Sequence, residues 1–170
     1  MMRTGIGFDI HRFAQGRKLV LGGVHIASDV GLAGHSDADV LCHAVMDALL
    51  GSVADGDIGL HFPDNEKRWK DADSLKMLAA VGRRLKNKGA AIINIDASVL
   101  AEKPRLAPYR EKMRGNIARS LGIDKARISI KATTLEGLGA LGRGEGIAVM
   151  AVATVSLSCH SRASGNPERI

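Results

Sequence analysis

The chain has 170 residues, a formal net charge of +6, 45% hydrophobic residues and only 3% aromatic residues. This favours one domain with an aliphatic core, and because the chain has neither a run of ~18 apolar residues nor a targeting segment, we expect a cytoplasmic protein without membrane contact. The positive charge would suit a nucleic acid, but the basic residues are dispersed and few aromatic residues are available for base stacking. A small phosphorylated ligand would also suit this charge.

The first predicted element is a strand at residues 3–13. Alternation places two sets of side chains on opposite faces: Ile6, Phe8 and Ile10 on one, and Gly7, Asp9 and His11 on the other. We expect the apolar set to face the hydrophobic core. Residues 18–26 follow as a hairpin that turns at its two adjacent glycines.

A helix is predicted from Ser36 to about Val53, with Ser36 and Asp39 as a capping box in which aspartate replaces glutamate. Its apolar positions at helical spacing form a buried stripe. Cys42 lies in this helix and Cys159 in a polar tail, so both are expected to be free thiols. Residues 54–73 form a glycine- and aspartate-rich loop, and a loop this long in a compact domain suggests a function.

The second half of the chain alternates helices and strands. Helices are predicted at residues 73–88 and 108–122, and strands at 91–101, 127–133 and 146–157. The last strand is apolar on both faces, which is typical of a central strand or of one covered in an oligomer. The order predicts an α+β fold in which helices cover one face of a mixed sheet of about four strands, beside a small N-terminal hairpin. Residues 1–157 are expected to be one catalytic domain and 158–170 a disordered tail.

Asp9 and His11 lie two residues apart on the first strand, so both side chains project the same way. His43 offers a third ligand from the first helix, where Asp39 and Asp47 lie one turn to either side and are expected to support it. One carboxylate and two imidazoles leave a fourth tetrahedral position open, which is the pattern of catalytic zinc. The alternative is an ordinary ion pair at the end of a strand.

Three other segments carry candidate residues, and each also has a purely structural interpretation. His35 and Ser36 either cap the first helix or face an anion at its N-terminus. The loop containing Asp57 and Asp64 is either a set of turns or a binding site for a polyol, because its spacing is not that of a calcium-binding EF-hand. Residues 131–146 contain five glycines and two threonines, and they form either a flexible hairpin or a loop that approaches phosphates without the Walker pattern.

Four motifs occur in one order: GFDIHRF, GHSDADVLCHAVMDALLG, GDIGLHFPD and KATTLEGLGALGRGEGIA. Together they resemble the 2-C-methyl-D-erythritol 2,4-cyclodiphosphate synthase family of the non-mevalonate route to isoprenoid precursors. The resemblance covers Arg3 to Leu157. It implies a homotrimer with active sites at the subunit junctions. In the implied reaction, the 2-phosphate of 4-diphosphocytidyl-methylerythritol 2-phosphate attacks the β-phosphorus, and CMP leaves.

The resemblance implies roles for the candidate residues. Asp9, His11 and His43 match the zinc ligands, and Glu136 matches the ligand of a second ion, magnesium or manganese. His35 and Thr134 match the residues that stabilise charge in the transition state. Positioning of the reacting phosphates and neutralisation of their charge would supply the catalysis, and no protein nucleophile would be needed.

The resemblance also implies contacts to the substrate along much of the chain. Asp57, Ile58 and Gly59 match the segment that binds the methylerythritol hydroxyls. The segment from Ala101 to Ala107 matches the cytidine-recognition loop. The full set of implied contacts is Ile10, Ser36, Asp57, Ile58, Gly59, Phe62, Pro63, Asp64, Asn65, Glu66, Ala101, Glu102, Lys103, Pro104, Arg105, Leu106, Ala107, Thr133, Leu135, Ala140 and Arg143. Ala140 and Arg143 match a cavity on the trimer axis where some members bind isoprenoid diphosphates, and Ala140 there replaces a frequent aromatic residue.

Two interpretations from other classes compete with the enzyme. A non-catalytic module that binds a metal or an isoprenoid diphosphate would need the trimer but not Thr134 or Glu136, so the presence of both argues against it. A basic RNA-binding domain would bind unrelated RNA in a salt-sensitive manner.

Overall fold

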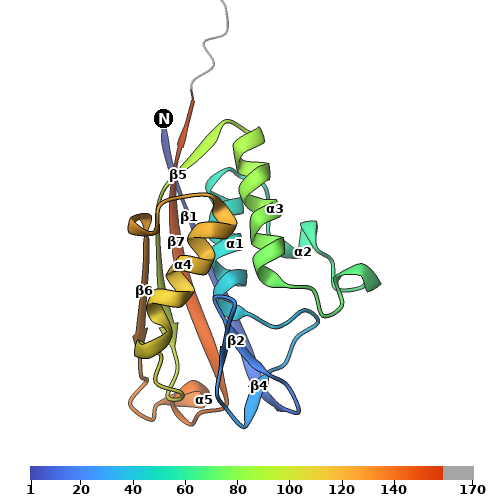
Figure 1. Cartoon of the computed structure of the whole chain (residues 1–170), viewed down its shortest axis with the longest axis vertical. Coiled ribbons are helices and arrows are strands. Elements are labelled where there is room, and N and C mark those ends of the chain that lie inside the picture. The colour runs from blue at the N-terminus through green and yellow to red at the C-terminus, as the bar shows by residue number, and fades with distance from the viewer. Residues whose placement is uncertain (159–170) are drawn as a thin grey trace, which may run out of the picture.

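The computed structural model of the chain describes residues 1–158, and its central feature is a five-stranded mixed sheet (Figure 1). The strands are β1 (Met2–Gln15), β4 (Val30–Leu32), β5 (Ala90–Leu100), β6 (Ile128–Thr133) and β7 (Gly146–Leu157), in the order β4-β1-β7-β5-β6. β5 pairs with β6 in parallel, and the other neighbours pair antiparallel. The four expected strands are all present, β7 is central as predicted, and the short β4 was missed. Cys159 and the expected disordered tail lie outside the described residues, apart from Ser158.

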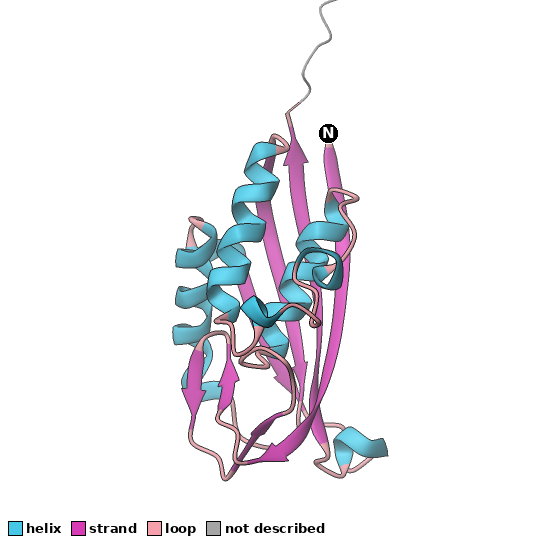
Figure 2. Ribbon diagram, turned by 90° about the vertical axis from the view of Figure 1, so that its right-hand side faces the viewer, coloured by secondary structure: helices cyan, strands magenta, loops and turns pink. Residues whose placement is uncertain are grey.

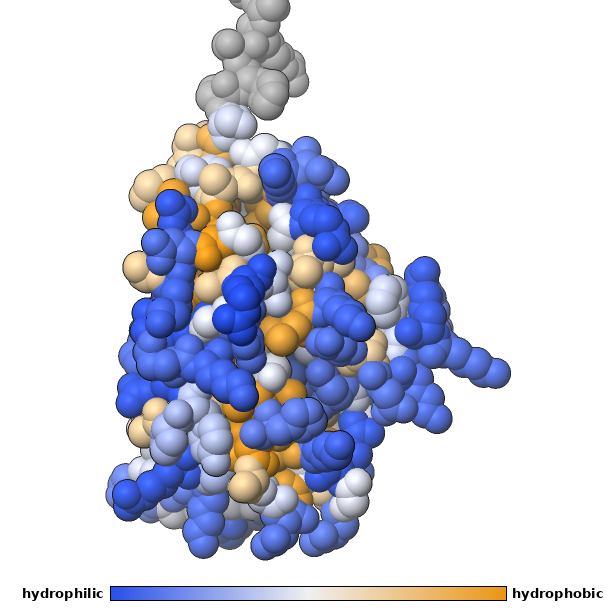
Figure 3. Space-filling view, in the orientation of Figure 1, coloured by the Kyte–Doolittle hydropathy of each residue, from blue (hydrophilic) through white to orange (hydrophobic). Residues whose placement is uncertain are grey.

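Three helices lie on one face of this sheet, as the sequence predicted (Figure 2). They are α1 (Val40–Ser52), α3 (Ser74–Asn87) and α4 (Arg110–Leu121). The predicted hairpin is present as β2 (Leu19–Leu21) and β3 (Val24–Ile26). Most of the side seen in Figure 3, where α3 and α4 lie in front, is hydrophilic. Within the described residues, no helix combines the length and apolar character that crossing a bilayer requires.

The contact between α1 and β1 sets the layer spacing, and it depends on glycine. A Cβ atom on Gly7 would lie 2.0 Å from the carbonyl oxygen of Ala44, and one on Gly5 would lie 2.2 Å from that of Ala48. These distances are too short for any side chain, so α1 rests directly on the backbone of β1. The aliphatic core continues from this contact to the buried faces of α3, β5 and β7.

The expectation that Ile6, Phe8 and Ile10 face the core is wrong. Their side chains are 65%, 53% and 53% exposed, because the glycine face of β1 is the one that meets α1. Phe8 pairs across the sheet with Met150, and Ile6 pairs with Val152; both partners on β7 are also exposed. The helix-free face of the sheet therefore carries a contiguous apolar strip, which we call the bare face.

Local predictions failed where tertiary contacts intervene. α1 is capped by Asp39, whose side chain accepts from the Cys42 N–H, and not by Ser36. The chain before that cap passes through Ala38, whose φ of 58° is left-handed, so Ser36 lies outside the helix. The loop at 54–73 contains a short helix, α2 (Ile58–His61), and a 3₁₀ turn, η1 (Lys67–Trp69). A bulge in β5 between Ile92 and Asn94 interrupts its alternation and leaves Ile93 40% exposed.

The remaining elements are short. A 3₁₀ turn, η2 (Ala107–Tyr109), leads into α4, and another, η3 (Lys125–Arg127), leads into β6. The glycine-rich segment after β6 contains α5 (Gly139–Gly142). Gly122 ends α4 in the left-handed conformation that favours glycine, with φ of 65°.

Candidate metal centre and active site

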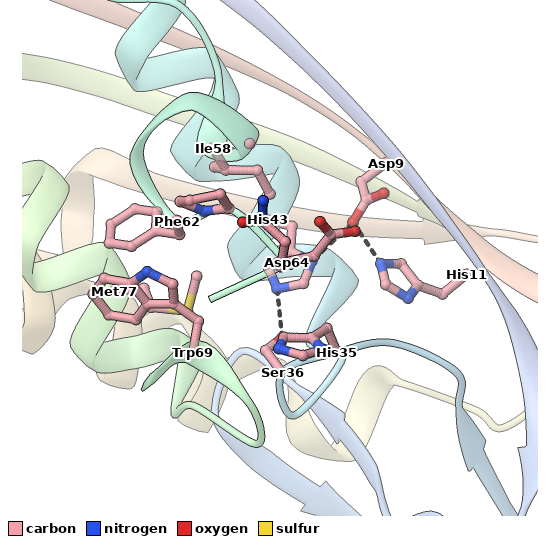
Figure 4. A pocket seen from close by; sticks show the side chains of 13 residues that line it. Asp9, His11, His35, Ser36, His43, Ile58, Phe62, Asp64, Trp69 and Met77 are labelled. Carbon is pink, nitrogen blue, oxygen red and sulfur yellow. Dashed lines mark hydrogen bonds and ion pairs between the residues drawn. The ribbon is translucent and has the colours of Figure 1, made fainter. Parts of the chain in front are cut away.

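Asp9 and His11 from β1 meet His43 from α1, as the sequence spacing predicted (Figure 4). The Oδ2 atom of Asp9 lies 2.9 Å from Nε2 of His11 and 3.0 Å from Nδ1 of His43. One ligand atom from each residue lies within 4.8 Å of the other two. His43 is nearly buried, and it reaches Asp9 because the glycine contact brings α1 against β1.

The donor set fits a divalent transition metal. The Nδ1 atom of His11 hydrogen bonds to the carbonyl oxygen of Ala33, which can only accept, so Nδ1 carries the proton. Nε2 is then the ring nitrogen left to bind an ion, in the same space as the Asp9 carboxylate. An oxygen and two imidazole nitrogens that converge in this way, with one ring oriented by a backbone carbonyl, suit zinc and similar ions.

The charges within the cluster support one another. Burial acts to raise the pKa of the Asp9 carboxyl, but hydrogen bonds from His11 and His43 outweigh it and hold that pKa well below its usual range. Burial also acts to lower the pKa of His11, and the hydrogen bond to Asp9 outweighs it, so the net shift is upward. Asp9 is thus ionised at neutral pH, which is the form that a metal requires.

The expectation that Asp39 and Asp47 support His43 is wrong. The fully buried Asp39 accepts from the backbone N–H groups of Gly22 and Gly23 as well as Cys42, and so it fastens the β2–β3 turn to the start of α1. Burial raises the pKa of its carboxyl. Asp47 instead accepts from the N–H of Ile58 at 2.8 Å and positions α2. Both carboxylates therefore bind backbone groups.

His43 is oriented by two serines and not by these carboxylates. Its Nε2 atom lies 3.1 Å from Oγ of Ser36 and 3.1 Å from Oγ of Ser74. Ser74 is the first residue of α3 and is fully buried, and its hydroxyl donates to Oδ1 of Asp37 at 2.5 Å. Ser74 is 31 residues from His43 in the chain, so no local spacing pattern indicated this contact.

The cluster lies at one end of a pocket of about 410 Å³. The pocket is formed by β1, α1, the loop before α1, and the segment that runs from α2 through η1 into α3. Its lining residues are Asp9, His11, His35, Ser36, His43, Ile58, Gly59, Phe62, Pro63, Asp64, Asn65, Trp69 and Met77. All were among the candidates except Trp69 and Met77, which were not predicted from the sequence. Trp69 lies edge-on to Phe62 with ring centroids 4.9 Å apart, and an aromatic residue in the long loop was the available signal.

The other candidates do not line this pocket. A second hollow of about 810 Å³ lies by β4 and α5, and it is lined by Phe13, Ser28, Asp29, Val30, Glu102, Lys103, Pro104, Arg105, Gly142, Arg143 and Gly144. The two hollows share no lining residue. Ala101 and Leu106, expected to contact substrate, are buried in the core, whereas Ile10 is on the bare face. Asp57 caps α2 by accepting from the N–H of Leu60.

The segment after β6 is organised by its own hydrogen bonds. Thr134 donates from Oγ1 to Oε1 of Glu136 at 2.5 Å, and Glu102 accepts from the N–H of Leu135 at 2.7 Å. Glu136 has a left-handed backbone with φ of 52°, which is uncommon for a residue other than glycine. Thr134, expected to stabilise charge, and Glu136, expected to bind an ion, are thus hydrogen bonded to each other.

The chain matches the family model described as the YgbB family over residues 2–156. A relative from Alkaliphilus metalliredigens is 56% identical over 157 residues, which cover 92% of this chain and 99% of the relative. A relative from Moorella thermoacetica is 58% identical over 151 residues, which cover 89% of this chain and 93% of the relative. Both relatives carry the name 2-C-methyl-D-erythritol 2,4-cyclodiphosphate synthase.

Solved structures show the same fold. The bifunctional IspDF from Campylobacter jejuni superposes with a TM-score of 0.90 at 42% identity over 93% of this chain, which spans 43% of the length of that longer protein. The CDP complex of IspF from Plasmodium falciparum superposes with a TM-score of 0.81 at 32% identity, covering 92% of this chain and 97% of the other.

Proposed function

The chain belongs to the YgbB family, and we propose that the cluster of Asp9, His11 and His43 is the metal centre of its reaction. The enzyme converts 4-diphosphocytidyl-2-C-methyl-D-erythritol 2-phosphate into 2-C-methyl-D-erythritol 2,4-cyclodiphosphate and CMP, a step in the formation of isoprenoid precursors. The observation that carries the site assignment is the convergence of one carboxylate oxygen and two imidazole nitrogens at the pocket of about 410 Å³.

The three ligands would hold zinc or another divalent transition metal. Such an ion supplies Lewis-acid stabilisation of negative charge on phosphate oxygens. The protein's own contribution is to bind and orient the substrate so that its 2-phosphate oxygen is in line with the β-phosphorus. A new P–O bond forms there as the bond to the CMP oxygen breaks, and CMP departs with that electron pair.

The pocket offers groups for each part of this substrate. His35 and Ser36 lie beside the cluster on its lining, where they would donate hydrogen bonds to phosphate oxygens. The α2 segment, with Ile58 and Gly59, would contact the methylerythritol portion. The lining residues Phe62, Pro63, Asp64 and Asn65 would close the same side of the pocket, with Glu66 next to them in the chain.

We further propose that the second hollow binds the cytidine end of the substrate and that the enzyme is a homotrimer. The residues implied in cytidine binding, among them Glu102, Lys103 and Arg105, line that hollow, which is separate from the metal pocket of the same chain. A neighbouring subunit would then complete each site at a junction. The bare face supports assembly, because monomeric proteins rarely leave so many large apolar side chains in contact with water.

Thr134 and Glu136 would act with a second divalent ion, magnesium or manganese, that arrives with the substrate phosphates. The Glu136 carboxylate is exposed and offers the hard oxygen ligand that these ions prefer. The hydroxyl of Thr134, already directed at that carboxylate, would turn toward a phosphate oxygen. Residues 1–157 would thus function as one catalytic domain. Ala140 and Arg143, near the same hollow, remain proposed contacts at the trimer axis.

Mass spectrometry of reaction products tests this function directly. We expect the purified protein to release CMP and the cyclic diphosphate from the linear substrate in equal amounts. A chelator should stop both products, and added zinc with magnesium should restore them. Turnover that persists unchanged in chelator-stripped protein would contradict the metal assignment, whereas absence of both products under all conditions would contradict the reaction itself.

A further inference from the structure

A chain of hydrogen bonds, buried at His43 and Ser74 and half-buried at Asp37, runs from the metal cluster to the N-terminus of α3. It links Nε2 of His43 to the hydroxyl of Ser74 at 3.1 Å, and that hydroxyl to Oδ1 of Asp37 at 2.5 Å. The other carboxylate oxygen of Asp37 accepts from the backbone N–H of Ser74 at 3.0 Å. Asp37 thus binds both the amide and the hydroxyl of one residue, and it can move relative to Ser74 only by breaking one of these bonds.

The direction of each hydrogen bond follows from the chemistry of its groups. An ionised carboxylate can only accept, so the single hydroxyl proton of Ser74 points at Asp37. The oxygen of Ser74 can then only accept from Nε2 of His43, which must carry a proton. Nδ1, the atom that faces Asp9 at 3.0 Å, is therefore the ring nitrogen left for an ion.

We propose that Asp37 and Ser74 are positioning residues of the metal centre: they hold His43 in the tautomer and orientation that present Nδ1 to the ion. The inference rests on the proposed metal role of His43. Neither residue hydrogen bonds to Asp9 or His11, and His11 is oriented separately, by the carbonyl of Ala33. The Asp37 carboxylate also strengthens the Ser74–His43 bond, because a charged acceptor polarises the hydroxyl between them.

Zinc affinity measures this role without relying on turnover. In Ser74→Ala the acceptor is removed, Ser36 remains as the other partner of Nε2, and the ring becomes free to tilt and to exchange tautomers. Losing such a partner of a ligand typically weakens metal binding by about 10–100-fold. We expect a weakening of about 10-fold at the lower end of that range, measured by competition between metal-stripped protein and a chromophoric chelator.

Ser52→Ala is the matched control. Ser52 is also a nearly fully buried serine in the covering layer, but its hydroxyl donates to the carbonyl of Leu49, in the same helix. Both variants lose one buried hydroxyl, so they should lower the melting temperature of the metal-free protein to similar extents. Only Ser74→Ala should weaken zinc binding. Equal zinc affinity in Ser74→Ala and Ser52→Ala would overturn the inference while leaving the metal site of the wild-type protein intact.

Asp37→Asn tests the second positioning residue, and it replaces Ser74→Ala as the test if that variant does not fold. The amide has one oxygen where the carboxylate has two, so it cannot accept from the N–H and the hydroxyl of Ser74 through separate oxygens, and zinc affinity should again fall. Long-range ¹H–¹⁵N spectra of histidine-labelled, metal-free wild-type protein give the tautomer directly. A proton on Nε2 of His43 is expected, and a proton on Nδ1 alone would overturn the inference. Failure of the wild-type protein to bind zinc would instead overturn the proposed metal-dependent function as well.

Discussion

The two faces of β1 differ in residue size and in what covers them. On the covered face, Gly5 and Gly7 admit the backbone of α1, and the strand continues into the metal cluster. On the bare face, Ile6, Phe8 and Ile10 are more than half exposed. The smallest side chains are thus the most tightly packed, and the largest are in contact with water. Apolar alternation indicates that a face is to be buried, but it does not say whether the same chain buries it.

The largest effect should come from the covered face. Replacing His43 with alanine removes one of three metal ligands, and loss of the ion removes several kcal/mol of charge stabilisation. We expect kcat/KM for CMP release to fall by about 10³-fold or more. Size-exclusion chromatography of the variant should match the wild-type protein, because His43 is remote from the bare face. A wild-type rate in metal-stripped His43→Ala would refute the assignment.

The bare face should show the opposite pattern. Phe8→Asp places a charge in the centre of the apolar strip, and we expect it to convert the assembly to monomers in analytical ultracentrifugation. Activity should be lost with assembly, since the proposed site draws on two subunits, yet zinc binding by each chain should persist. Asn87→Asp, at the exposed end of α3, is the control because it adds the same single negative charge. A Phe8→Asp protein that stays assembled and active would refute the proposed interface.

The glycine contact on the covered face should matter for the stability of the fold. In Gly7→Ala the new methyl group would lie 2.0 Å from a backbone oxygen, so strand and helix must move apart. We expect a loss of about 3 kcal/mol in the free energy of unfolding, measured by urea denaturation. Gly51→Ala, in α1, meets only a carbonyl at 3.8 Å and should gain about 0.5–1 kcal/mol from helix propensity. Equal effects of the two substitutions would contradict the backbone contact.

The smallest effect should come from the anchor between two covering helices. Asp55 follows α1 and binds Arg84 and Lys88 of the α3 C-terminal region; the Arg84 hydrogen bond leads the lowering of its pKa to about 2. Because the folded-state pKa lies below the unfolded value near 3.8, the ionised carboxylate stabilises the fold above about pH 4, and this contribution disappears as the pH falls towards 2. Asp55→Asn should therefore lower the melting temperature by a few degrees at pH 7, and the difference should fade to almost nothing below pH 2. A constant difference across this range would exclude the ion pair as its cause.

Sequence periodicity predicted where the helices and strands lie better than it predicted what packs against them. The four long strands and the covering helices followed from apolar spacing and from glycine and proline positions, and the i, i+2 spacing of Asp9 and His11 correctly directed both to one site. His43 was found because helix geometry places it opposite the apolar stripe of α1. These predictions succeeded because each depends on residues that are close in sequence.

The failures concern contacts between distant segments. The helical line through Asp39, His43 and Asp47 suggested carboxylate support for the ring, yet Asp39 is drawn to the β2–β3 turn and Asp47 to α2. The actual partner, Ser74, is on another helix. Likewise, no local pattern separates the candidate residues into two hollows. Such pairings are decided by tertiary packing, which a single chain's periodicity does not encode.

The backbone contact between α1 and β1 has a consequence for how the enzyme can change over generations. Where two main chains touch, their separation is set by covalent dimensions and not by the sizes of neighbouring side chains. Substitutions elsewhere in the aliphatic interior can enlarge or shrink residues without altering the distance from carboxylate to imidazole. Substitutions in the interior should therefore leave the ligand geometry unchanged. Substitution of Gly5 or Gly7, which a single-nucleotide change can cause, should disturb it.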